Sequence, residues 1–333
     1  MLGELLGNYR IVRKLGEGGM GEVYLAQHEG IGTHVAVKLL FPHISTETAH
    51  VDRFFNEARA VAKIRHAGIV KISDVGFTPT GRAYLLMEFL EGESLSDRIA
   101  RGPLPLPAAC ELGRQIASVL AATHATGVIH RDLKPDNIFL VPDLEQPGGE
   151  RAKVLDFGIA KLTGALAHGL PTQSQSTMGT PMYMSPEQWG DASKVDARAD
   201  IYSLGCIVFE ALAGRPPFQA SSMMEACALH TQAPAPHIRS LVPELPQSID
   251  DLLDRMLAKL PADRPQTAQE LVRVFSDLRG SSGTYEVRFG VGTAPAGALG
   301  PPRTEAMRPP PKTEAMPGLA QGSAPANQAA GEP

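Results

Sequence analysis

The chain contains little cysteine for its 333 residues: Cys110, Cys206 and Cys227 are its only thiols. No two of them form a Cys-x-x-Cys pair, which argues against disulfides or a cysteine-based zinc site and favours a reducing compartment. The sequence also lacks an apolar run of the roughly 18 residues needed to cross a bilayer. Its first residues show no cationic stretch followed by an apolar one. We therefore expect no membrane span, no signal peptide and a cytoplasmic location.

An excess of positive charge is also missing. The net charge is −5 and the pI is about 6.1, so a dedicated nucleic-acid-binding function is disfavoured. Apolar residues make up 43% of the chain, which is ordinary for a globular protein. The length allows two lobes and a tail.

The most informative stretch is His-Arg-Asp-Leu-Lys-Pro-Asp-Asn at residues 130–137, followed later by Asp156-Phe157-Gly158. Asp132 can accept a hydroxyl proton, and Lys134 can neutralise charge on a moving phosphoryl group. Asn137 and Asp156 can bind a divalent metal through oxygen atoms. Either motif alone could arise by chance, the first as a polar turn and the second as an unrelated Asp-Phe-Gly loop. The two motifs together in this order indicate phosphoryl transfer.

These motifs resemble the protein kinase family, specifically the bacterial Hanks-type serine/threonine kinases, over residues 9–278. The resemblance implies an α+β, two-lobed fold: a small, mainly antiparallel β lobe with one key helix at about 9–87, a hinge at 88–92, and a larger, mainly helical lobe at about 93–278. It also implies ATP, with Mg²⁺ or Mn²⁺, and protein substrates.

Residue periodicity predicts the elements of both lobes. Amphipathic or apolar patterns predict helices at 51–65, 109–126, from 200 onward, and 267–278, the last opened by the Thr267-x-x-Glu270 capping box. Strands are expected at 9–15, 22–26, 35–40, 70–77 and 83–88.

The motif Gly16-x-Gly18-x-x-Gly21 fits either a dinucleotide-binding turn or the glycine-rich hairpin of a kinase. A strand follows here (Val23, Tyr24), whereas the dinucleotide motif requires a helix. By resemblance, the nucleotide site comprises Leu15, Gly16, Gly18, Gly19, Gly21, Val23, Ala36, Lys38, Met87, Glu88, Leu90, Phe139 and Asp156.

Lys38 ends Val-Ala-Val-Lys and, without other information, would be an exposed strand-end lysine. Glu57 lies near the apolar face of its predicted helix, where a charge needs a partner. The resemblance pairs Glu57 with Lys38 and assigns Lys38 to the α- and β-phosphates. It also makes Lys134 and Thr180 markers of a serine/threonine kinase.

Several supporting roles follow from the same resemblance. Glu187 should pair with Arg264, and Asp200 should hold the catalytic loop. Four side chains should stack between the lobes in the active enzyme: Val61, Ile72, His130 and Phe157.

Arg131 needs an anion, and a phosphorylated activation segment would supply one. We expect phosphorylation of at least one of Thr172, Ser174, Ser176 and Thr177, by autophosphorylation that can involve a kinase dimer. The alternative is a polar loop whose hydroxyls have no role.

Residues 279–333 are rich in Gly, Pro and Ala, and we expect them to be disordered. Thr-Glu-Ala-Met occurs twice there, at Thr304 and Thr313. Phosphorylated, these threonines would resemble ligands of forkhead-associated domains; a duplicated neutral spacer is the alternative.

Two other functions compete with an active protein kinase. A nucleotide-binding scaffold that acts through its tail would be expected to lack Lys38, Asp132, Asn137 or Asp156, and all four are present. A small-molecule phosphotransferase would lack the Gly-Thr…Ser-Pro-Glu segment at residues 179–187.

Overall fold

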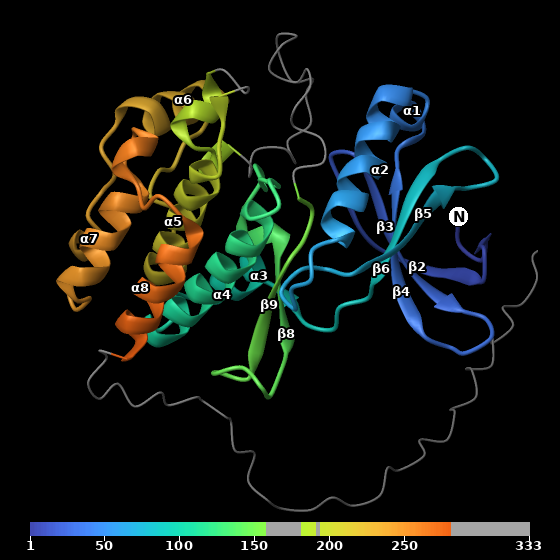
Figure 1. Cartoon of the computed structure of the whole chain (residues 1–333), viewed down its shortest axis with the longest axis horizontal. Helices are drawn as coiled ribbons and strands as arrows, with labels where there is room; N and C mark the ends of the chain where they lie inside the picture. Colours follow the sequence, from blue (N-terminus) through green and yellow to red (C-terminus); the bar gives the residue numbers. More distant parts are fainter. Residues whose placement is uncertain (158–180, 191–193, 281–333) are drawn as a thin grey trace, which may run out of the picture. The chain divides into compact units, whose positions relative to one another are not determined.

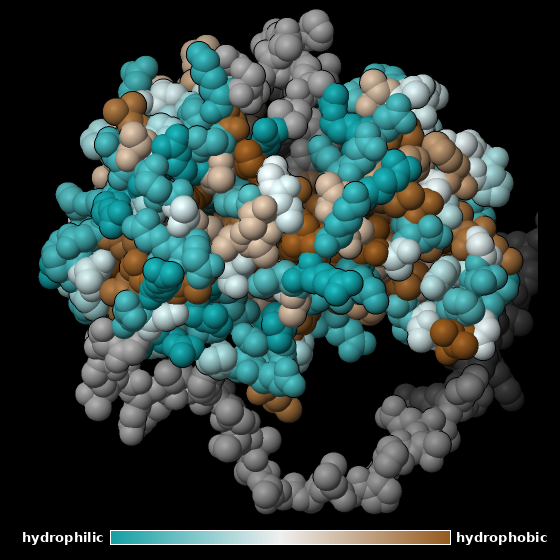
Figure 2. All heavy atoms as spheres, viewed as in Figure 1, coloured by the Kyte–Doolittle hydropathy of each residue, from teal (hydrophilic) through white to brown (hydrophobic). Residues whose placement is uncertain are grey.

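The structure is a computed structural model that describes residues 1–157, 181–190 and 194–280. All described residues belong to one compact unit, Met1–Val287. Within the described ranges, no helix is both long enough and apolar enough to cross a membrane. Mainly hydrophilic side chains cover the face shown in Figure 2.

The N-terminal lobe is built on a six-stranded antiparallel sheet with strand order β1-β2-β3-β4-β6-β5 (Figure 1). Helix α2 packs beside this sheet and buries an apolar stripe that includes Phe54, Phe55 and Ala58. The elements are β1 (Leu5–Leu6), β2 (Tyr9–Gly18), β3 (Gly21–His28), β4 (His34–Leu40), α1 (Pro42–Ser45), α2 (Thr48–Ala62), β5 (Ile72–Phe77) and β6 (Ala83–Glu88).

The larger lobe is mainly helical and carries a small sheet of order β7-β8-β9. Its strands are β7 (Glu93–Ser94), β8 (Ile138–Pro142) and β9 (Glu150–Val154), and residues 143–149 connect β8 to β9 in a hairpin. Its helices are α3 (Leu95–Ala100), α4 (Leu106–His124), α5 (Arg198–Ala213), α6 (Met223–Gln232), α7 (Gln247–Met256) and α8 (Ala268–Gly280), with short 3₁₀ turns at Pro135–Asn137, Pro181–Tyr183, Pro186–Trp189, Ile238–Ser240 and Pro261–Asp263.

Helix α5 is the centre of this lobe, as its nearly uniform apolar sequence predicts. Ile201, Leu204 and Phe209 are fully buried. The helix ends at Gly214, whose φ of 72° lies in the left-handed region that glycine adopts without strain.

The last helix begins at the predicted place but with a different cap. Thr267 Oγ1 accepts from the Glu270 N–H at 3.2 Å, which is one half of a capping box. The Glu270 carboxylate accepts from the N–H of Gln266 rather than that of Thr267. The helix continues to Gly280 instead of ending near Leu278.

Candidate functional site

The catalytic loop brings Asp132, Lys134 and Asn137 together, as predicted. The Asn137 side-chain amide donates to the Asp132 backbone carbonyl at 2.8 Å and to its Oδ2 at 3.2 Å. Lys134 Nζ lies 3.9 Å from the same Oδ2. Because the Asn137 nitrogen is engaged, its carbonyl oxygen is left as the group that can bind a metal.

Asp200 holds this loop from the start of α5, which confirms the prediction. It is fully buried, and its two carboxylate oxygens accept from the backbone N–H groups of His130 and Arg131, both at 2.8 Å. Arg131 has a φ of 61°, an uncommon value for a residue with a side chain. These hydrogen bonds, with one from Gln188 to the Arg131 carbonyl at 2.8 Å, hold the backbone in that conformation.

His124 is a further partner of Asp200 that the sequence analysis missed. Its Nε2 lies 2.7 Å from Asp200 Oδ2, at the carboxyl end of α4. No motif marks this histidine, because the contact joins positions that only the packed fold brings together.

Lys38 and Asp156 form the main ion pair between the two lobes, with 2.6 Å between Nζ and Oδ1. Lys38 projects from β4, and Asp156 follows β9 with a φ of 45°. Burial alone would raise the pKa of Asp156, but the charge and hydrogen bond of Lys38 outweigh it and hold this pKa below its ordinary value. Asp156 is therefore ionised at neutral pH and can bind a cation.

The predicted Lys38–Glu57 ion pair is absent from this structure, so that expectation is wrong for this conformation. Glu57 Oε2 is buried and has no hydrogen-bond partner among the described residues. Burial raises the pKa of Glu57 to about 7, against the opposing charges of Arg53 and Arg131. A carboxyl with this pKa is partly protonated at neutral pH and competes poorly with ionised Asp156 for the ammonium.

The raised pKa of Glu57 has a consequence for stability. Its folded-state pKa lies above the ordinary value of 4.5, so the folded state binds more protons than the unfolded state between about pH 4.5 and 7. Stability should fall as pH rises through this window. We expect Glu57→Gln to raise the melting temperature at pH 8, with the gain shrinking toward pH 4.5.

Thermal unfolding followed by circular dichroism at several pH values measures this effect. Glu47→Gln, at an exposed position just before α2, is the matched control and should show no such pH-dependent gain. A Glu57→Gln variant less stable than the parent at pH 8 would mean that ionised Glu57 has a partner in solution.

The sheet register gathers the predicted nucleotide-binding side chains on one face. Val23 pairs directly with Lys38, and Ala36 pairs directly with Met87. Directly paired residues project to the same side of an antiparallel sheet, as do residues two apart in one strand. Val23, Ala36, Lys38 and Met87 therefore share a face. Gly16 pairs with Val23 at the same edge.

The four glycines of the β2–β3 hairpin are not all required for the same reason. A Cβ at Gly21 would lie 1.9 Å from the Leu39 carbonyl oxygen, so packing of β3 on β4 excludes any side chain there. A Cβ at Gly16, Gly18 or Gly19 would meet no atom within 4 Å. Protein packing does not explain these three glycines, whereas close approach of a ligand to the backbone does.

The chain between the lobes contributes backbone groups. The Glu88 N–H is bonded to the Lys71 carbonyl at 2.9 Å, and the Glu88 side chain is held by Lys153 at 2.6 Å. The Leu90 N–H has no hydrogen-bond partner within the described part of the chain, which leaves a donor for a ligand. Leu15 and Phe139, the other apolar residues of the predicted site, are partly buried.

The four predicted stacking residues join one cluster. Val61 and Phe157 are buried in the main hydrophobic core, and Ile72 packs against it. The rings of His130 and Phe157 lie 4.7 Å apart.

Glu187 and Arg264 form the predicted ion pair. The guanidinium donates to both carboxylate oxygens, at 2.7 and 2.8 Å, and the Arg264 side chain is fully buried. It also donates to the carbonyls of Ala258, Lys259 and Arg198.

Some predicted residues lie outside the described residues. They are Gly158, Thr180, the candidate phosphorylation sites Thr172, Ser174, Ser176 and Thr177, and Thr304 and Thr313 of the tail. Arg131, the proposed phosphate partner, is described. Its Nε is buried and has no hydrogen-bond partner among the residues that the structure describes.

Comparison with known proteins agrees with this geometry. A family model described as "Protein kinase domain" matches residues 9–275. The chain is 45% identical over 264 residues to serine/threonine-protein kinase Pkn1 of Myxococcus xanthus, covering 79% of this chain and 37% of Pkn1. It is 38% identical over 271 residues to PknH of Mycobacterium tuberculosis, covering 81% of this chain and 42% of PknH. The chain thus spans less than half the length of these curated relatives.

Solved structures give the same result for the fold. The crystal structure of the Mycobacterium tuberculosis PknI kinase domain is 28% identical, with a TM-score of 0.62, and the match covers 84% of this chain and 99% of that chain. A second structure of the same domain is 29% identical, with a TM-score of 0.63. From the match over residues 9–275 and these relatives, the chain belongs to the protein kinase family, among its bacterial serine/threonine members.

Proposed function

We propose that this chain transfers the γ-phosphate of ATP to serine and threonine hydroxyls of proteins. The observation that carries the proposal is that two pairs of residues, one in the catalytic loop and one between the lobes, have the contacts that phosphoryl transfer requires. Asp132 and Asn137 are hydrogen-bonded in the loop anchored by Asp200, while Lys38 and Asp156 are paired at the junction of the lobes. The proposed domain boundaries are 9–278 for the kinase and 279–333 for the tail.

Each residue has a distinct role in the proposed reaction. Asp132 accepts the proton of the acceptor hydroxyl, and Lys134 offsets negative charge on the transferred group. Lys38 binds the α- and β-phosphates. The adenine lies on the face formed by Val23, Ala36 and Met87. The other nucleotide-site residues named in the sequence analysis are proposed to contact the same nucleotide.

The residues present fit a divalent metal, Mg²⁺ or Mn²⁺, because Asn137 and Asp156 offer the oxygen donors such ions prefer. The metal, when bound, neutralises phosphate charge. In this structure the Asp156 carboxylate pairs with Lys38, and it would be shared between Lys38 and the metal. The fold thus leaves a cation-binding carboxylate ionised and in place.

The test is transfer of labelled phosphate from γ-labelled ATP to a mixture of dephosphorylated proteins, followed by phosphoamino-acid analysis. Phosphoserine and phosphothreonine are expected. The competing scaffold function predicts nucleotide binding without transfer, and a small-molecule phosphotransferase predicts label only in the small-molecule fraction. Either outcome would reject the proposal.

Activity should rise after autophosphorylation between Thr172 and Thr177, in trans within a transient kinase dimer. The support is Arg131, whose buried Nε has no hydrogen-bond partner among the described residues and can bind phosphate. We expect a variant with alanine at Thr172, Ser174, Ser176 and Thr177 to lose the activation seen on preincubation with ATP. Phosphopeptide mapping and initial rates before and after preincubation measure this. Unchanged activation in the variant would show that these hydroxyls are not the switch.

We also propose that the tail binds a phosphothreonine reader of the forkhead-associated type. Its support is the repeated Thr-Glu-Ala-Met, with a methionine three positions after each threonine. A peptide of residues 300–318 phosphorylated on Thr304 and Thr313 should bind such a domain, and two sites on one tether should raise avidity for a two-site partner. The control is the unphosphorylated peptide. Equal binding of both peptides, or of neither, would reduce the tail to a spacer.

A further inference from the structure

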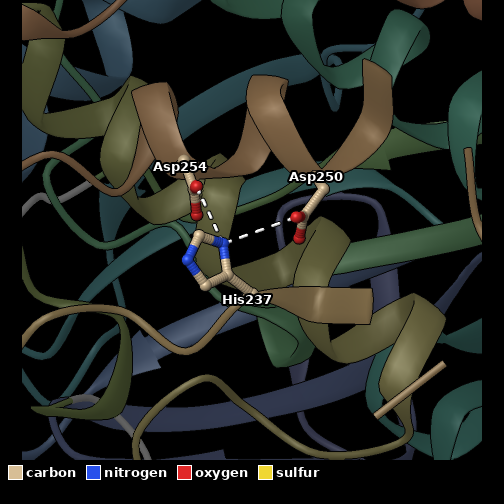
Figure 3. Close-up of side chains that lie close together, drawn as sticks. All are labelled: His237, Asp250 and Asp254. Carbon is tan, nitrogen blue, oxygen red and sulfur yellow. Dashed lines mark ion pairs between the residues drawn. The ribbon is translucent and has the colours of Figure 1, made fainter. Parts of the chain in front are cut away.

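Far from the nucleotide site, a histidine and two aspartates converge between the segment that follows α6 and the helix α7 (Figure 3). His237 immediately precedes the short Ile238–Ser240 turn, and Asp250 and Asp254 are four residues apart on α7. Residues at this spacing share one face of a helix, so both carboxylates face His237. The proposed kinase chemistry uses none of the three.

The distances from His237 to the two aspartates are close to those between neighbouring ligand atoms of a tetrahedral metal site. His237 Nδ1 lies 3.4 Å from Asp250 Oδ2 and 3.0 Å from Asp254 Oδ2. In a tetrahedron with bonds of 2.0–2.1 Å, neighbouring ligand atoms are about 3.3 Å apart. One ligand atom from each residue lies within 4.8 Å of the others. A single ion can therefore contact all three with little movement.

Asp250 is a poorly satisfied buried carboxylate. It is 5% exposed, yet its contacts with the Arg239 N–H, the Gln247 amide and His237 are all 3.4 Å long. Hydrogen bonds to carboxylates are usually well under 3.2 Å. Burial without strong partners is costly for a charged group. Weak contacts at a buried carboxylate favour a bound cation, and this argument is independent of the spacing.

The surrounding charge is negative. Asp251 adds a further carboxylate on α7, directly after Asp250. The Arg239 guanidinium is directed to Gln247, not to either aspartate. Among the described residues, no lysine or arginine forms an ion pair with Asp250 or Asp254.

We propose that His237, Asp250 and Asp254 form a zinc-binding site that ties the segment between α6 and α7 to helix α7. One imidazole nitrogen with two carboxylate oxygens is a donor set that Zn²⁺ accepts, whereas Mg²⁺ prefers oxygen alone. The exposed side of His237 leaves the fourth position to water.

Calorimetric titration of the metal-free full chain with zinc chloride tests the site. Excess Mg²⁺ is present throughout so that oxygen-only sites are filled. We expect one high-affinity Zn²⁺ per chain. His237→Gln and Asp254→Asn should each weaken binding by more than the roughly 10–100-fold that loss of an outer-shell partner costs.

His50→Gln is the matched control, because His50 pairs with a single carboxylate, Glu47, at 3.0 Å. Cys227→Ser tests the one cysteine that is not buried. Both variants should bind zinc like the parent. Zinc should also raise the melting temperature of the parent and of both controls, but not of the His237 and Asp254 variants.

Two results would contradict the proposed zinc site. No zinc binding by the parent would leave the cluster as an ion pair of protonated His237 with the two aspartates. Binding of equal strength in the parent and in the His237 and Asp254 variants would place the metal elsewhere. Asp254 is used for the variant rather than buried Asp250, so that folding is preserved.

Discussion

Asp132→Asn should lower the rate of phosphoryl transfer by about 10²–10⁴-fold while nucleotide affinity stays unchanged. The substitution removes the proton acceptor but keeps the side-chain volume. Lys38 and Asp156 are paired with each other, and the proposed metal ligand Asn137 keeps its shorter hydrogen bond to the backbone carbonyl of residue 132. Steady-state transfer to a protein substrate and calorimetric titration with ATP and Mg²⁺ measure the two quantities separately.

Asp52→Asn is the matched control for Asp132→Asn, because it removes one carboxylate from an exposed position on α2. It should retain the parent's rate and affinity. An Asp132→Asn enzyme with near-parental turnover would remove Asp132 from its proposed role. Loss of nucleotide binding in that variant would instead assign the residue to binding.

Arg264→Leu should destabilise the helical lobe by about 3–5 kcal/mol, the usual cost of removing one partner from a buried ion pair. The guanidinium is fully buried and donates to both Glu187 oxygens. Without it, Glu187 and the neighbouring backbone carbonyls lose their donors. Urea denaturation followed by circular dichroism measures the change in the free energy of unfolding.

The exposed pair of Arg255 with Glu270, at 3.1 Å, provides the contrast. Arg255→Leu should cost no more than about 1 kcal/mol, because an exposed ion pair contributes little in water. Similar losses for the two leucine variants would mean that the Glu187–Arg264 pair has no special structural role.

The catalytic loop could be predicted from sequence because its chemistry is local. Asp132 and Asn137 are five positions apart, so a single turn brings them into contact. The strands were also predictable, since short runs rich in apolar and β-branched residues favour strands such as β3, β4 and β6 without knowledge of their partners.

The partner of Lys38 could not be derived in the same way. Glu57 and Asp156 are both carboxylates within reach of one ammonium, and their sequence context does not say which is ionised. In this structure Glu57 is buried without Lys38, which raises the pKa of Glu57 to about 7, while Lys38 keeps the pKa of Asp156 low. Burial depends on how α2 packs, which sequence periodicity does not specify.

Three helices of the larger lobe, α3, α6 and α7, were not predicted, and α6 and α7 were missed for different reasons. Helix α7 carries Ile249, Leu252, Leu253 and Met256 at helical spacing, so an available signal was overlooked. Helix α6 buries only Ala226 and His230, which leaves little periodicity to detect.

The central claim is that this chain is an active serine/threonine kinase, and the most direct test is the mass of the enzyme itself. Parent and Asp132→Asn proteins, first treated with phosphatase, are incubated with ATP and Mg²⁺ and analysed by intact and peptide mass spectrometry. We predict added phosphoryl groups on serine or threonine in the parent and none in the variant. A parent that stays unmodified, or a variant modified to the same extent, would contradict the claim.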